Sequence, residues 1–128
     1  MEFKVNFNSE ELIYMQLCNQ IIYGIATSKL HEGDMLPSCR IMADIVGINM
    51  HTVNKAYMTL CKMGIVQSNS RNGTVIVIDK NKSQVINNIR CELETVLAKC
   101  KCFNITKKDI YSLIDESIDK FQIINGEK

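Results

Sequence analysis

Two short amphipathic segments separated by only three residues limit most strongly how this chain can fold. In each segment apolar residues recur at three- and four-residue spacing, which predicts one buried face of a helix. The predicted buried residues are Ile41, Met42, Ile45 and Val46 in the first segment and Val53, Ala56, Tyr57 and Leu60 in the second. Gly47-Ile48-Asn49 interrupts the pattern, and Ser38 and Asn49 can cap the two helices. Two helices joined this tightly are typical of a helix-turn-helix.

The residues before this pair predict a further helix and a turn. Apolar residues recur at helical spacing over residues 10–30, and Ser9 is the expected N-cap. Tyr14 lies on this stripe, and we interpret it, like Tyr57, as a core residue with its hydroxyl at the edge. His31-Glu32-Gly33-Asp34, which follows, has the composition of a turn.

The residues after the pair predict a β-hairpin. Gly64 suits a left-handed cap at the end of the second helix. Residues 65–67 and 74–78 are rich in β-branched side chains, and residues 68–73 between them end in the turn dipeptide Asn-Gly. Three helices followed by a hairpin make a winged helix-turn-helix. We expect this domain to span residues 1–78.

Residues 79–128 change character and predict two amphipathic helices. Their apolar positions are Val85, Ile86, Ile89, Leu93, Val96, Leu97 and Cys100 in the first helix and Ile110, Leu113, Ile114, Phe121 and Ile124 in the second. Thr106 and Asp109 stand in capping-box-like positions between them. The fold class is therefore mainly α with a small β-hairpin. Because a lone helical hairpin leaves its apolar stripe exposed, we expect this segment to pair with a second copy as a homodimer.

Composition excludes several classes of protein. With 46% hydrophobic residues the chain can form a core. The first residues do not resemble a signal peptide, and no apolar run approaches the ~20 residues of a membrane helix, so we expect a cytoplasmic protein without a membrane partner. The six cysteines are expected to be free thiols, because disulfide frameworks belong to small secreted domains.

Charge and side-chain chemistry favour double-stranded DNA as the partner. The net charge is only +1, but residues 38–74 contain four basic residues and one acidic residue. The face of the second helix-turn-helix helix opposite its buried residues carries Met50, His51, Asn54, Lys55 and Met58. Asparagine can pair with adenine and lysine can neutralise phosphate, and residues 49–64 include no acidic side chain.

Several motifs together resemble one family. The segments LPSCRIMA (36–43) and GINMHTVNKAYMTL (47–60) are similar to the DNA-binding module of the GntR family of bacterial regulators. IYMQL (13–17) and RNGTV (71–75) match the family's first helix and wing. The resemblance, together with the exposed face, implies DNA contacts from Ser38, Arg40, Asn49, Met50, His51, Thr52, Asn54, Lys55, Arg71, Asn72, Gly73 and Thr74. Leu12 and Asn72 depart from the residues that many relatives carry.

The short tail points to a subgroup of that family. Larger GntR members append a ligand-binding domain of well over a hundred residues, whereas only 49 residues follow position 79 here. Two helices of this length resemble the YtrA-like subgroup, in which the tail mainly dimerises. A twofold dimer would present two DNA-binding helices to a palindromic operator, and we expect a repressor because a dimer this small has little surface left to recruit polymerase. A small-molecule effector is left open, since no residue cluster nominates its site.

Three other interpretations stay open. Cys91, Cys100 and Cys102 could serve a thiol- or metal-responsive regulator, although Cys-x-Cys matches the spacing of structural zinc poorly. The winged helix could instead be a protein-interaction module. An enzyme is disfavoured, because no phosphate-binding glycine loop or nucleophile–base arrangement is apparent. We expect no cofactor and no catalytic residues.

Overall fold

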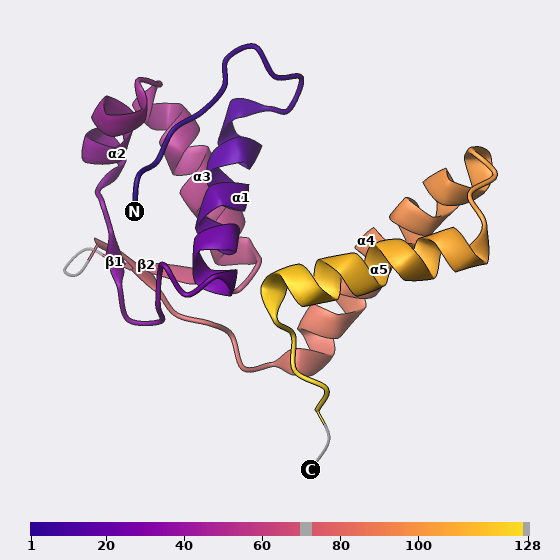
Figure 1. Ribbon diagram of the computed structural model, residues 1–128. Coiled ribbons are helices and arrows are strands. Elements are labelled where there is room, and N and C mark those ends of the chain that lie inside the picture. The colour runs from indigo at the N-terminus through magenta and orange to yellow at the C-terminus, as the bar shows by residue number, and fades with distance from the viewer. Residues whose placement is uncertain (70–72, 127–128) are drawn as a thin grey trace. The chain divides into compact units, whose positions relative to one another are not determined.

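The computed structural model describes residues 1–69 and 73–126, which form two compact units, Met1–Lys80 and Asn81–Lys128. The first unit contains helices α1 (Ile13–Ala26), α2 (Cys39–Val46) and α3 (Met50–Lys62) and strands β1 (Met35–Leu36), β2 (Val66–Asn69) and β3 (Gly73–Ile76). The second contains α4 (Lys82–Cys102) and α5 (Lys107–Phe121) (Figure 1). The predicted winged helix-turn-helix followed by two helices is confirmed.

The helix-turn-helix forms where the sequence predicted it, and its caps are as expected. The Ser38 hydroxyl oxygen accepts a hydrogen bond from the Ile41 amide, and the Asn49 side chain accepts one from the His51 amide. Gly47 ends α2 with a φ of +77°, a conformation that costs little only for glycine. The chain can therefore turn into α3 within three residues.

The sheet has one strand more than the predicted hairpin. Its three strands are antiparallel in the order β1-β3-β2, with Met35 opposite Val75 and Leu36 opposite Thr74. The paired residues of β2 and β3 begin with Val66 opposite Ile76 and continue to the turn of the hairpin. The predicted strand residues that lie further from the turn are therefore unpaired in this ladder. Strand β1 was not predicted, because two residues are too few to show the alternation of apolar and polar side chains that indicates a strand.

The core lies between α1, α2, α3 and the sheet. As predicted, α3 buries Val53, Ala56, Tyr57 and Leu60. The prediction for α2 was half wrong, because Met42, Ala43 and Val46 are buried whereas Ile41 and Ile45 are more than half exposed. The side of α2 that carries the small Ala43 faces the core. The side that carries Ile41 and Ile45 therefore faces solvent.

The beginning of α1 also differs from the prediction. The helix starts at Ile13 with Leu12 as its N-cap, and it ends at Ala26. Ser9 is not the cap, because its hydroxyl accepts a hydrogen bond from the Glu11 amide in the preceding turn. Residues 7–11 instead form a turn before the helix, and Phe3 ahead of that turn is buried.

In the second unit, Thr106 caps α5 by accepting a hydrogen bond from the Asp109 amide, as predicted. The placement of Ile124 on this helix was wrong, because α5 ends at Phe121 with a left-handed cap at Gln122. Among the described residues of this unit none is buried, and an apolar hollow of about 290 Å³ is lined by residues of both helices. The predicted apolar stripes thus lie on an open surface.

Candidate nucleic-acid interface

The outward face of α3 carries the predicted polar and basic side chains. His51, Asn54 and Lys55 are exposed, and Thr52 is half-buried at the edge of the face. The apolar Met50 and Met58 are 43% and 53% exposed on the same helix. This face follows from the inward one, because a step of 100° per residue turns positions 51, 55 and 58 away from the core.

Two of the candidate residues already make hydrogen bonds within the protein. The side-chain oxygen of Asn49 accepts from the His51 amide at 2.7 Å, so its amide nitrogen is the group left for a base or phosphate. The Ser38 oxygen accepts from the Ile41 amide at 3.2 Å and can still donate its hydroxyl hydrogen. Asn54 is different, since its side-chain nitrogen donates to the sulfur of Met58, at 3.5 Å, and its side-chain oxygen accepts no hydrogen bond from the described residues.

Arg40 extends from a helix start that is held in place from the core. It is the second residue of α2 and is exposed. The hydroxyl of the buried Tyr57 donates a 2.7 Å hydrogen bond to the Pro37 carbonyl, which joins α3 to the residues just before α2. Burial raises the pKa of Tyr57, so the hydroxyl remains a donor at neutral pH. The interpretation of Tyr57 as a core residue with its hydroxyl at the edge is confirmed.

Lys55 has a contact that the sequence did not reveal. Its ammonium lies 4.3 Å from the centre of the Tyr14 ring, at the start of α1. Tyr14 itself is half-buried and packs against the core, as predicted. The pairing was missed because the two residues are 41 positions apart, and neither shows a pattern that depends on the other.

The wing is described only in part. Arg71 and Asn72 lie outside the described residues. Gly73 is exposed at the start of β3, and the Thr74 hydroxyl lies 2.9 Å from the hydroxyl of Ser68 on β2. Ser68 and Thr74 therefore form a hydrogen-bonded pair across the hairpin.

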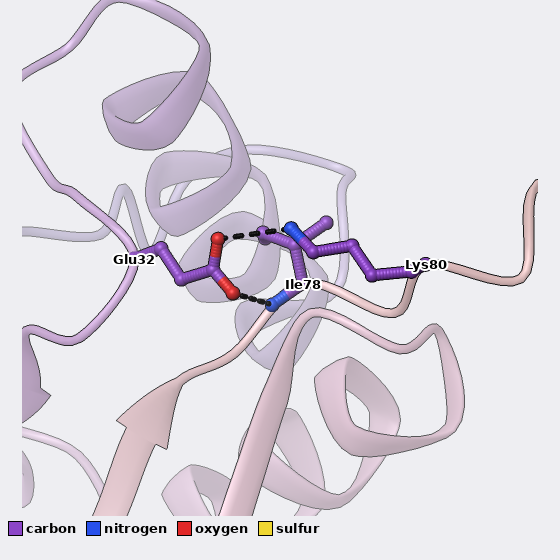
Figure 2. A network of polar contacts seen from close by, with 3 residues as sticks. All are labelled: Glu32, Ile78 and Lys80. Carbon is purple, nitrogen blue, oxygen red and sulfur yellow. Dashed lines mark hydrogen bonds and ion pairs between the residues drawn. The ribbon is translucent and has the colours of Figure 1, made fainter.

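The turn before β1 is tied to the end of the first unit. One Glu32 carboxylate oxygen accepts a hydrogen bond from the Ile78 amide at 3.3 Å, and the other lies 3.1 Å from the Lys80 ammonium (Figure 2). The hydrogen bond and charge of Lys80 lower the pKa of Glu32 below its ordinary value. Glu32 thereby holds the last residues before the second unit against the turn.

The six cysteines are free thiols in the structure. Cys91 and Cys102 are exposed on α4, and Cys100 is half-buried on the apolar stripe. No group of three or more His, Cys, Asp or Glu side chains among the described residues could hold a metal ion. Burial raises the pKa of Cys18 to about 11, which keeps that thiol protonated.

None of the helices in the described part of the chain is sufficiently long and apolar to cross a membrane.

A winged helix-turn-helix whose third helix presents basic and amide side chains defines a DNA-binding protein of the winged-helix class. The model of the family described as "Bacterial regulatory proteins, gntR family" matches residues 13–76, which is half of the chain. The chain belongs to the GntR family of DNA-binding transcription regulators.

Similar proteins extend this match into the second unit. The HTH-type transcriptional regulator YhcF of Bacillus subtilis is 30% identical over 109 residues, covering 81% of this chain and 88% of that protein. YtrA from Sulfolobus acidocaldarius, described as a GntR-family transcription factor, has 31% identity and a TM-score of 0.61, covering 92% of this chain and 97% of that chain. A transcriptional antiterminator from Listeria monocytogenes EGD-e has a TM-score of 0.82 at 24% identity, covering 100% and 98%, and supports the fold.

Proposed function

We propose that this chain is a cytoplasmic repressor that binds a palindromic operator as a homodimer. The observation that carries the proposal is the chemical difference between the exposed surfaces of the two units. The first presents the polar and basic face of α3, whereas the second exposes two apolar helix faces. One surface has the chemistry of a DNA contact and the other that of a protein contact.

The second unit supports the dimer. Ile89, Leu93 and Val96 on α4 are each about half exposed, as is Leu113 on α5. Monomeric proteins rarely leave so continuous an apolar surface in water. Because the stripe follows both helices, a second copy related by a twofold axis would cover it with the same stripe of its own helices.

The first unit supports sequence-specific binding. Asn54 and His51 can reach base edges from α3, and Lys55 and Arg40 can neutralise phosphates. Ser38, Asn49, Met50, Thr52 and the wing residues Arg71, Asn72, Gly73 and Thr74 complete the proposed contact surface. A twofold dimer would present two such surfaces, which matches the two half-sites of a palindrome.

Repression is proposed over activation because of size. If the first unit binds DNA and the second binds a second copy, these two units have little surface left to recruit polymerase. Blocking a promoter requires no further surface. The proposal includes no enzymatic reaction, in keeping with relatives that are described as transcription regulators.

The test measures binding to a labelled palindrome from the gene's own upstream region. Fluorescence anisotropy reports the binding at two salt concentrations. The native protein is expected to bind with a steep salt dependence, and Arg40→Ala should lower the affinity by ~1–3 kcal/mol. Arg90→Ala is the matched control, because Arg90 lies on α4 and its guanidinium donates to Asn87. Native protein that binds no upstream fragment, or an equal loss in both variants, would contradict the proposal.

A further inference from the structure

The contact between Lys55 and Tyr14 joins α3, the recognition helix that is proposed to contact the DNA bases, to the start of α1. The Lys55 ammonium lies 4.3 Å from the ring centre, well within the ~6 Å over which a ring face attracts a cation. Tyr14 is the second residue of α1, and its half-buried ring packs against the core. The ring is therefore held by its own contacts, and the flexible lysine is the partner that is positioned.

We propose that Tyr14 is a positioning residue for DNA binding, which holds the Lys55 ammonium where it meets an operator phosphate. This inference rests on the proposed role of Lys55 as a phosphate contact. It assigns to an aromatic residue of α1, outside the helix-turn-helix, a part in the affinity of α3 for DNA.

Three physical arguments favour positioning over competition. A lysine ammonium has three N–H donors, so a ring under one side leaves donors for a phosphate oxygen on the other. A lysine side chain also loses much rotational freedom when it is fixed, and a contact that restricts it beforehand lowers the cost of binding. The attraction to the ring also strengthens when bound DNA removes water from around the pair.

The test compares Tyr14→Leu with Tyr14→Phe in operator binding by the full-length protein. Phenylalanine retains the ring and leucine removes it. Tyr14→Leu should weaken binding about 2- to 5-fold, which is the effect of one exposed cation–ring contact, and Tyr14→Phe should bind like the native protein. Tyr23→Leu makes the same change further along α1 and should leave the affinity unchanged.

A double-mutant cycle distinguishes positioning from a general effect on folding. In a Lys55→Met background, Tyr14→Leu should cause no further loss of affinity, because the group that it positions is absent. Lys55→Met alone should also reduce the salt slope of binding by about one phosphate contact. Urea unfolding of each variant checks that the fold is intact at the assay temperature.

Three outcomes would overturn the inference. Tighter binding by Tyr14→Leu would mean that the ring competes with the phosphate. An equal loss in Tyr14→Phe would assign the effect to the hydroxyl. An undiminished loss in the Lys55→Met background would separate Tyr14 from Lys55. Failure of the native protein to bind any operator would instead contradict the proposed function, and the Arg40→Ala comparison identifies that case.

Discussion

Single side chains connect parts of this protein that are far apart in sequence. Glu32 joins the turn before β1 to Ile78 and Lys80, which lie at the end of the first unit (Figure 2). Tyr57 similarly joins α3 to the residue before Ser38. Neither link shows in the local sequence, whereas the caps at Ser38 and Asn49 do, because a cap and its amide lie within three residues of each other.

The Glu32 contact predicts a pH dependence of stability. The pKa of Glu32 is lowered in the folded protein. Its ion pair with Lys80 therefore stabilises the fold fully at pH values above 4.5, the ordinary pKa of the carboxyl group. The contribution is lost as the pH falls through the lower folded-state pKa. Glu32→Gln should therefore unfold at a slightly lower urea concentration than the native protein at pH 7, and the difference should disappear in acid.

Lys80→Met provides the matched control for this prediction. It removes the main cause of the lowered pKa and retains the Ile78 amide. The effect of Glu32→Gln should consequently be smaller in the Lys80→Met background. A difference between native and Glu32→Gln proteins that persists unchanged at acid pH would show that the ion pair is not its origin.

At the scale of elements, the end of α3 is fixed by one close approach. Gly64 has a φ of +81°, and a Cβ built there would lie 2.7 Å from the Cβ of Asp79. The Asp79 amide donates a 2.7 Å hydrogen bond to the Gly64 carbonyl, so the two backbones cannot easily separate. The Ile65 amide also bonds to the Leu60 carbonyl, as in a glycine-terminated helix.

Gly64→Ala and Gly47→Ala form a matched pair that measures this approach. Gly47 also has a positive φ, of +77°, but among the described residues nothing apart from its own chain neighbours lies within 4 Å of a Cβ built there. Gly47→Ala should lower the free energy of unfolding by ~1–2 kcal/mol from backbone strain alone. Gly64→Ala should cost about 1–3 kcal/mol more, because the methyl group also meets Asp79. Equal losses in urea unfolding would mean that the backbones at Gly64 and Asp79 move apart without cost.

The sequence predicted the helices of both units and their order, because apolar residues recur at helical spacing within each long helix. It failed where the outcome depends on another element. The sequence could not show which side of α2 faces the core. Apolar residues lie on two flanks of this helix, and packing against the neighbouring helix leaves the flank with Ile41 and Ile45 exposed. Strand β1 needs β3 as its partner, and residues 35–36 show no pattern of their own.

The same limit applies to the candidate interface. The exposed face of α3 followed from its buried face, so the positions of His51, Asn54 and Lys55 could be predicted. The contact of Lys55 with Tyr14 could not, because it depends on how α1 packs beside α3. The hydrogen bond that occupies the Asn49 oxygen could be predicted, since the same residue was the expected cap.

At the scale of the whole molecule, the account depends on two copies acting together. The first unit has a buried core of its own, whereas the described residues of the second unit expose apolar side chains on both helices. Pairing through α4 and α5 would bury those side chains and supply the two recognition helices that a palindrome requires. Dimer formation and operator binding should therefore be lost together.

The most direct test is the number of chains bound to one palindromic duplex, measured by light scattering coupled to size-exclusion chromatography. The native protein should be a dimer alone and should place two chains on the palindrome. Leu93→Glu, which puts a charge on the exposed stripe of α4, should be monomeric and bind the palindrome at least ~10-fold more weakly, because the half-sites then bind separately. A native monomer that binds a single half-site as tightly as the full palindrome would contradict the account.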